Sequence, residues 1–131
     1  MKEKQIIDKY LGIQYVHKGR DLEGLDCWGL VVAVYADAGI DIFDLEDYER
    51  NWSLKGRNHF MENYYEKWVK HSSPIFKDVL LFYGGRDIVN HAGIYLKNGK
   101  FIHAARAGVV VTRLEGKWKE RLEGVYRYAE D

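Results

Sequence analysis

One cysteine, Cys27, and two of the five histidines, His91 and His103, are the residues of this 131-residue chain that could support nucleophilic catalysis. A thiol attacks a carbonyl after a base has taken its proton, and that base needs a third group to hold its ring. Cys27, His91 and His103 would fill these roles in that order. One cysteine and two histidines can also bind zinc, although their spacing here matches no common zinc signature.

Cys27 stands where a polar loop turns into an apolar helix. Asp26 is placed to cap the first backbone N–H groups of this helix, and Gly39 to end it in a left-handed conformation. The apolar residues that recur at helical spacing in between are Leu30, Val31, Val34, Tyr35 and Ala38. Because a helix start carries partial positive charge, we expect the thiolate to be favoured. A lone cysteine is also a common small buried residue, so that interpretation stays open.

The two histidines lie on either side of a predicted β-hairpin. A two-residue turn would place their rings on opposite faces of the sheet. A three-residue loop over 97–99, with Gly99 in the left-handed conformation, would instead pair Gly93 with His103. His91 would then lie diagonally from His103 on the same face, with α-carbons about 7–8 Å apart. Because Gly93 has no side chain to separate the rings, we expect the three-residue loop.

The rest of the chain predicts helices followed by strands. An amphipathic helix over 3–11 precedes a loop over 13–26 that contains Tyr15, and a further aromatic stripe over 58–68 has helical spacing. His59 and His71 flank this stripe and are expected at the surface. Five strands are predicted after it, at 77–83, 90–96, 100–104, 109–112 and 124–128. This order is typical of an α+β domain with a five-stranded, mainly antiparallel sheet.

The bulk properties limit the partners. Lys plus Arg and Asp plus Glu both number 20, and this balance argues against nucleic acid or an anionic membrane as the main partner. A single cysteine excludes an internal disulfide. The first residues contain no apolar run or cleavage site, so we expect no signal peptide and synthesis in the cytoplasm. The length predicts one domain over 1–131.

The local motifs resemble those of the NlpC-type cell-wall cysteine peptidases, a papain-like family, and especially its phage-tail members. The likeness covers nearly the whole chain and begins at Tyr15. Its motifs are Asp26–Val31, Asp78–Phe82, His91–Leu96 and Phe101–Ala104, followed by Gly124–Tyr128, which resembles the tail-protein ending. The resemblance implies a papain-like fold, in which helices with the nucleophile at a helix start pack on the sheet.

The resemblance also implies roles for the three chemical residues. Cys27 would be the nucleophile, His91 the base and His103 the residue that orients the base. The implied reaction is hydrolysis of an amide bond in the stem peptide of peptidoglycan, often after D-glutamate and before diaminopimelate or lysine. The enzyme would need no cofactor and would act at the cell wall, where delivery as part of a phage tail would make tail proteins its partners.

Three further residues are implied near the substrate. Tyr15 matches a family tyrosine whose hydroxyl could help the backbone N–H of Cys27 to hold the oxyanion. Asp26 matches an acidic residue that binds a substrate amino group in some members. Trp28 stands where many members have serine, in the usual peptide subsite. The chain also has Lys77 where the family has glycine, and its segment over 41–73 is longer than in minimal members.

Two alternatives remain open from the sequence. A phage-tail subunit or cell-wall-binding module could keep this fold without hydrolysing anything. A zinc-dependent hydrolase could use Cys27, His91 and His103 as ligands.

Overall fold

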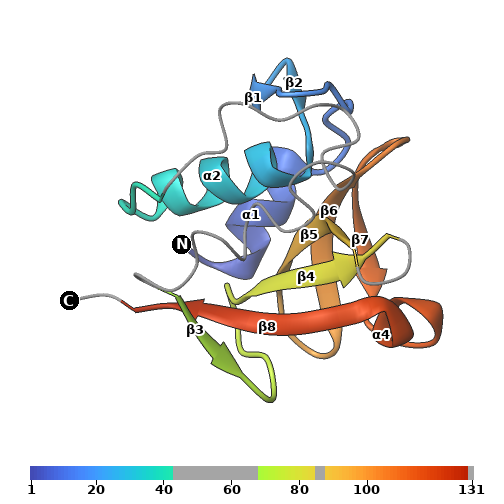
Figure 1. Ribbon diagram of the computed structural model, residues 1–131. Coiled ribbons are helices and arrows are strands. Elements are labelled where there is room, and N and C mark those ends of the chain that lie inside the picture. Colours follow the sequence, from blue (N-terminus) through green and yellow to red (C-terminus); the bar gives the residue numbers. More distant parts are fainter. Residues whose placement is uncertain (43–67, 85–87, 130–131) are drawn as a thin grey trace.

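The computed structural model describes residues 1–42, 68–84 and 88–129. Its helices are α1 (Glu3–Tyr10), α2 (Cys27–Asp37) and α4 (Lys117–Arg121). Its strands are β1 (Arg20–Asp21), β2 (Gly24–Leu25), β3 (Trp68–His71), β4 (Val79–Tyr83), β5 (Val89–Tyr95), β6 (Lys100–Ala105), β7 (Gly108–Arg113) and β8 (Leu122–Tyr128). Figure 1 shows α1 and α2 on the same side of the larger sheet. No helix among these residues is long and apolar enough to cross a membrane.

The larger sheet has six antiparallel strands in the order β3-β8-β4-β5-β6-β7. The α+β class is therefore confirmed, but the predicted number of five strands is wrong. The additional strand is β3, where Trp68 pairs with Tyr128 instead of ending a helix. Trp68 also makes edge-to-face contacts with the rings of Tyr35 and Tyr128, at centroid distances of 5.6 and 5.2 Å.

The remainder of the predicted aromatic helix, residues 58–67, lies outside the described residues, as does His59. His71 was expected at the surface, and the structure shows it only partly exposed and with a partner that the sequence did not indicate. It is half-buried at the end of β3, and its Nδ1 lies 3.2 Å from Nη1 of Arg127. The partner comes from β8, which pairs with β3, so no local sequence signal could have indicated it.

Helix α2 forms where the sequence predicts it. The side chain of Asp26 accepts a hydrogen bond from the backbone N–H of Gly29 at 2.8 Å, so the helix begins at Cys27. Gly39 follows the helix with a φ of 82°, which glycine adopts at low cost. The helix packs against β5 and β6 and fully buries Leu30 and Val34. Burial of an aliphatic side chain contributes about 1.5–3 kcal/mol, which anchors the helix to the sheet.

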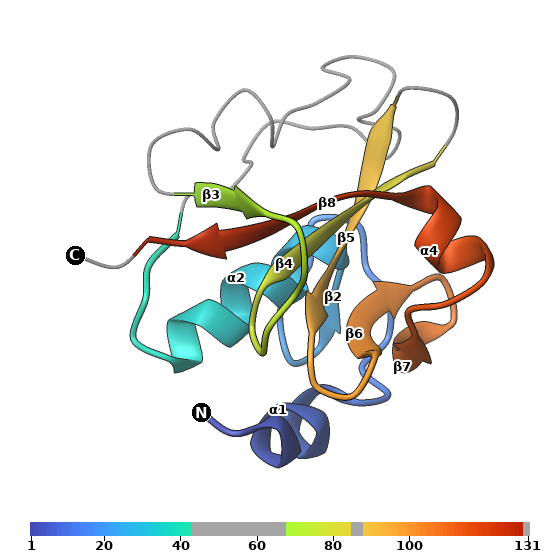
Figure 2. The ribbon, with the colours of Figure 1, turned by 90° about the horizontal axis from the view of Figure 1, so that it is seen from below.

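The sheet is covered on both faces near the chemical residues. Successive side chains of β4 point to opposite faces. Val79 and Leu81 face the main core, while Leu80 and Phe82 belong to a second cluster to which Trp118 of α4 packs. This explains why β4 reads as a continuous apolar run. The short helix α4, which the sequence did not predict, lies at the end of the sheet away from the C-terminus (Figure 2).

The predicted loop over 13–26 contains more structure than expected. Its two short strands, β1 and β2, pair in antiparallel fashion, and Tyr15 forms an isolated bridge with Leu25. The backbone of Tyr15 is therefore attached directly to the segment that leads into α2.

Candidate active site

The hairpin that carries the two histidines has the predicted register. Ile94 of β5 lies opposite Ile102 of β6. The backbone N–H of Leu96 donates to the carbonyl of Lys100 at 2.8 Å, so three residues form the loop. The last of them, Gly99, has a φ of 75°. The prediction of a three-residue loop with a left-handed Gly99 is confirmed.

This register places both imidazoles on one face. A methyl group added at Gly93 would lie 3.2 Å from Cβ of His103, so glycine leaves the space through which the rings approach each other. Nε2 of His91 lies 2.7 Å from Nδ1 of His103, which is a hydrogen-bond distance. The expectation that the two histidines meet on the same face is therefore confirmed.

The histidine pair continues to a third side chain. Nε2 of His103 lies 2.9 Å from Oγ1 of Thr112 on β7. His103 is only 1% exposed, so both of its ring nitrogens are used inside the protein. Thr112 was not identified from the sequence. The sequence feature that could have indicated Thr112 is its position as the one hydroxyl residue directly after the apolar run Val109–Val111, on the strand that follows His103.

Both histidines are electrically neutral at pH 7. Burial lowers the pKa of His91 to about 3, and the positive charges of His103 and Arg121 act in the same direction. Burial and Arg121 lower the pKa of His103 to about 4. Each ring then has one N–H, so one histidine donates to the other, and the direction of that bond depends on how His103 interacts with Thr112.

Cys27 lies against the hairpin at the start of α2. The backbone N–H groups of Ala92, which follows His91, and of Trp28 donate to its sulfur and favour the thiolate. Burial has the larger effect, and together with the negative charge of Asp26 it raises the pKa of the Cys27 thiol to about 12. The expected thiolate at the helix start is thus wrong for this state, because the thiol is only 5% exposed.

Asp26 and Trp28 lie inside the protein beside Cys27. Asp26 is 1% exposed, and its Oδ1 accepts from Gly29 N–H at 2.8 Å and from Arg20 Nη1 at 2.9 Å. Its Oδ2 accepts from the backbone N–H of Lys18 at 2.9 Å. Trp28 is 2% exposed and belongs to the main core. The structure therefore brings neither side chain into the cavity described next.

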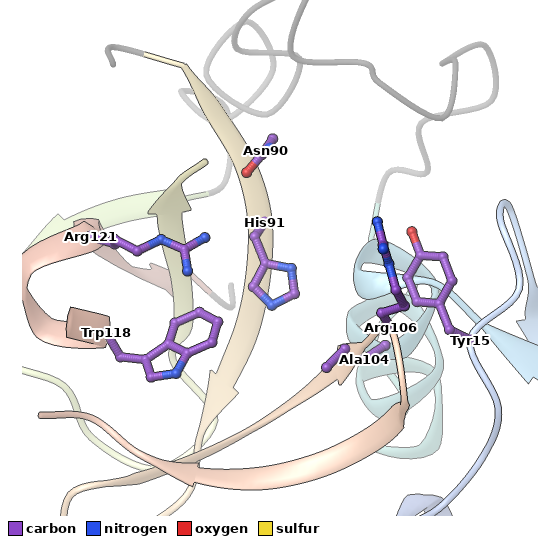
Figure 3. Close-up of a pocket in the computed structure, with 8 residues that line it drawn as sticks. Tyr15, Asn90, His91, Ala104, Arg106, Trp118 and Arg121 are labelled. Carbon is purple, nitrogen blue, oxygen red and sulfur yellow. The ribbon is translucent and has the colours of Figure 1, made fainter. Parts of the chain in front are cut away.

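A cavity of about 660 Å³ opens beside His91. The described residues that line it are Tyr15, Asn90, His91, Ala104, Ala105, Arg106, Trp118 and Arg121. Figure 3 shows Tyr15 and Arg106 on one side of His91, and Trp118 and Arg121 on the other. Of the residues predicted from the sequence, Tyr15 and His91 meet at this cavity, and His103 contacts His91 from the sheet. Cys27 is not among the lining residues.

The sequence reasoning missed Asn90, Arg106, Trp118 and Arg121. Asn90 directly precedes His91, and Arg106 follows the second histidine strand closely, so their positions could have indicated them. Trp118 and Arg121 are on α4, a five-residue helix with no buried residues, which leaves no periodic pattern to read.

The contact between the histidines has the geometry of a hydrogen bond and not of a metal site. Two imidazole nitrogens on one tetrahedral zinc, each bound at about 2.0–2.1 Å, would be about 3.3 Å apart. The observed separation is 2.7 Å. In the described part of the chain, no group of three or more His, Cys, Asp or Glu side chains is arranged to hold a metal ion.

Several curated proteins are similar to this chain. It is 32% identical over 127 residues to the gamma-DL-glutamyl hydrolase of Bacillus subtilis, and the match covers 95% of this chain and 28% of that protein. It is 29% identical to murein DD-endopeptidase MepS/murein LD-carboxypeptidase of Escherichia coli, with 91% and 59% covered. Tail tip assembly protein K of Escherichia phage lambda is 29% identical, with 79% and 53% covered. The chain thus spans 28–59% of the length of these relatives.

Solved structures share the fold. A NlpC/P60 family protein from Bacillus cereus superposes with a TM-score of 0.69 at 24% identity, covering 99% of this chain and 41% of the other. The NlpC/p60 domain of the peptidoglycan hydrolase SagA gives a TM-score of 0.62 at 23% identity, with 97% and 99% covered. The NlpC/P60 family model matches residues 12–127, which is most of the chain. The chain therefore belongs to the NlpC/P60 family.

Proposed function

We propose that this protein is a cysteine peptidase that hydrolyses an amide bond in the stem peptides of peptidoglycan. The main support is the 2.7 Å contact between His91 and His103 beside an open cavity, with the thiol of Cys27 held at the backbone of Ala92. Nucleophilic catalysis requires a thiol and a base that a second group orients, and the backbone contact of Cys27 is with Ala92, the residue that follows this base.

The tautomers needed for this role follow from the hydrogen-bonded chain. Because Nε2 of His91 is engaged with His103, Nδ1 of His91 is the nitrogen left to take the thiol proton. His91 must then donate its Nε2–H to Nδ1 of His103. His103 in turn carries its proton on Nε2 and donates to Oγ1 of Thr112. A hydroxyl that accepts at this position thus selects the productive tautomer of both rings.

The reaction starts from a neutral pair. The sulfur of Cys27 forms a bond to the substrate carbonyl carbon while its proton moves to Nδ1 of His91. The protonated His91 then donates to the leaving amine as the amide bond breaks, which leaves a thioester. Water attacks the thioester with His91 as the base, and the free acid and the thiol are restored.

The oxyanion would be held by the backbone N–H of Cys27 and the hydroxyl of Tyr15. A donor of this kind contributes about 3–4 kcal/mol to transition-state stabilisation. Tyr15 supports this role because it lines the same cavity as His91. Asp26 and Trp28, predicted near the substrate, would act through Cys27 in this proposal. Their buried contacts hold the helix start at which the thiol lies.

The substrate proposal draws on the relatives. Those relatives are named for gamma-glutamyl and murein bonds, and one is a phage tail tip protein. We propose the bond from D-glutamate to diaminopimelate or lysine as the one cut, with a phage tail as one route to the cell wall. The mechanism uses no cofactor. A single peptidase domain over 1–131 stays a prediction.

One observation favours a second candidate function. Cys27 is only 5% exposed, whereas catalytic cysteines are commonly reached from solvent. A tail or cell-wall-binding module that keeps the fold but does not hydrolyse would tolerate such burial.

Digestion of purified peptidoglycan with wild type and Cys27→Ala separates these functions. Mass spectrometry of the released muropeptides should show cut stem peptides with wild type and none with Cys27→Ala, under conditions in which circular dichroism shows both proteins folded. Full cleavage by Cys27→Ala would contradict the cysteine mechanism. Sedimentation of wild type with peptidoglycan, without released peptides, would support the binding module, and loss of cleavage only after chelation would support zinc.

A further inference from the structure

The described charged side chains that line the cavity beside His91 are all positive. Of the described residues that line it, two carry a permanent charge, Arg106 and Arg121, and none is a carboxylate. Figure 3 shows the two arginines on opposite sides of His91. A peptide lying across His91 would pass between two cations, so its own charge affects how well it binds.

Arg121 is the more rigidly held of the two. Its Nε donates to the carbonyl of Tyr83 at 2.9 Å, and its guanidinium carbon lies 4.6 Å from the ring centre of Trp118. These contacts fix the plane of the guanidinium, and Figure 3 shows it extending from α4 towards His91. Within the described part of the chain, the terminal nitrogens of Arg121 form no ion pair with a carboxylate, and its one hydrogen bond uses Nε. A half-buried, oriented cation without a counter-ion is favourable for binding an anion.

We propose that Arg121 binds a substrate carboxylate next to the amide that is cut, and that it makes the enzyme prefer peptides with a free carboxylate there. This inference rests on the proposed function. A D-glutamate joined through its γ-carboxyl keeps a free α-carboxylate in the same residue, with two methylene groups between its α-carbon and the scissile carbonyl. The planar fork of Arg121 matches a carboxylate in two parallel hydrogen bonds. A carboxamide at that position has no charge and directs one NH₂ group at N–H donors.

Arg106 has a different role in this arrangement. It is exposed on the opposite side of the cavity beside Tyr15, and no carboxylate among the described residues pairs with it. A long exposed cation raises the local concentration of acidic peptides but fixes no geometry. The discrimination between acid and amide is therefore assigned to Arg121.

The test compares two synthetic stem peptides, Ala-γ-D-Glu-Lys with the α-carboxyl of glutamate free or amidated. Wild type should cleave the acid with a kcat/KM about 10–100-fold above the amide, the range expected for hydrogen bonds to a charged group. Arg121→Gln should reduce this ratio to about one. Arg121→Lys should keep part of it, because the charge stays and the fork is lost. Arg113→Gln removes an exposed arginine outside the cavity and should leave the ratio unchanged.

The ratio isolates Arg121 from its effect on the histidines, since both peptides meet the same His91 and His103. Circular dichroism melts of Arg121→Gln and Arg121→Lys show whether the variants are folded. A ratio near one in wild type, or the same ratio in wild type and Arg121→Gln, would overturn the proposal.

Binding to Cys27→Ala protein, measured by calorimetry with both peptides, separates this proposal from the proposed function. If wild type cuts neither peptide but the acid binds Cys27→Ala more tightly in an Arg121-dependent manner, the peptidase function fails and the carboxylate site stands. If neither cleavage nor binding distinguishes the peptides, the carboxylate site is wrong.

Discussion

The start of α2 and the β5–β6 hairpin each bury one reactive group, but they hold it by different means. At the helix start, burial raises the pKa of the Cys27 thiol to about 12 beside the ionic network of Asp26. In the hairpin, burial lowers the pKa of His91 to about 3 beside an uncharged chain through His103 to Thr112. The opposite shifts have the same result, which is that both partners are neutral at pH 7.

Because of this difference, substitutions at the helix start should mainly affect folding stability, and substitutions in the hairpin should mainly affect activity. Asp26 joins a buried carboxylate to Arg20, to the helix start and to the loop, so its loss should reduce folding stability. His91 is half-buried at the edge of a cavity, so its loss should reduce activity far more than stability. Because the thiol of Cys27 and the imidazole of His91 are both neutral, the thiol proton moves to His91 only while the substrate reacts.

Removal of the proposed base should have the largest effect on activity. His91→Ala should lower kcat by about 10⁴-fold or more, because no other group takes the thiol proton. Its free energy of unfolding should fall by only about 1–3 kcal/mol, the cost of leaving Nδ1 of the buried His103 without its partner. Peptide cleavage and urea unfolding measure the two effects. His71→Ala is the control, since His71 lies on β3 outside the cavity, and equal losses in both variants would contradict the role of His91.

The parts that could be predicted from the sequence depend on short-range signals. The bounds of α2 follow from Asp26 and Gly39, which flank this helix in the sequence. The meeting of His91 and His103 follows from the length of one loop, because side chains alternate along a strand. Both predictions needed no knowledge of distant contacts.

The predictions from sequence that were wrong or missing concern features set by contacts between residues far apart in the chain. Trp68 has helical spacing with the aromatic residues before it, but its pairing partner is Tyr128. The pKa of Cys27 depends on how closely β5 covers the helix start, which overrides the favourable effect of the helix itself. Arg121 reaches the cavity through a helix that has no apolar periodicity.

Alkylation of the thiol tests whether the two regions are neutral in the free enzyme. A pKa of about 12 means that the thiolate fraction rises tenfold per pH unit across pH 6–9, and His91, with a pKa of about 3, adds no step there. The rate of reaction with iodoacetamide should thus rise about 10³-fold over this range without levelling off. Cys27→Ala is the blank, as Cys27 is the only cysteine. A rate independent of pH would mean a thiolate formed in advance.

Loss of the buried carboxylate should mainly destabilise the helix start. Asp26→Ala removes the buried carboxylate that accepts from Arg20 and from the N–H groups of Lys18 and Gly29. We expect the free energy of unfolding to fall by about 3 kcal/mol, the lower end for a broken buried pair because Arg20 is 25% exposed. Asp21→Ala, at the exposed residue of β1, should change it by less than about 0.5 kcal/mol. Equal losses by urea unfolding would show that the network contributes little.

The smallest expected effect lies at the far end of the histidine chain. Thr112→Val keeps the shape of the side chain but removes the hydroxyl that accepts from His103, so His103 no longer favours one tautomer. We expect kcat to fall about tenfold, the equivalent of one hydrogen bond, with KM unchanged. Thr112→Ser restores the hydroxyl and should restore kcat. If both variants lose activity equally, the packing of Thr112 would matter instead of its hydroxyl, and the neutral chain would end at His103.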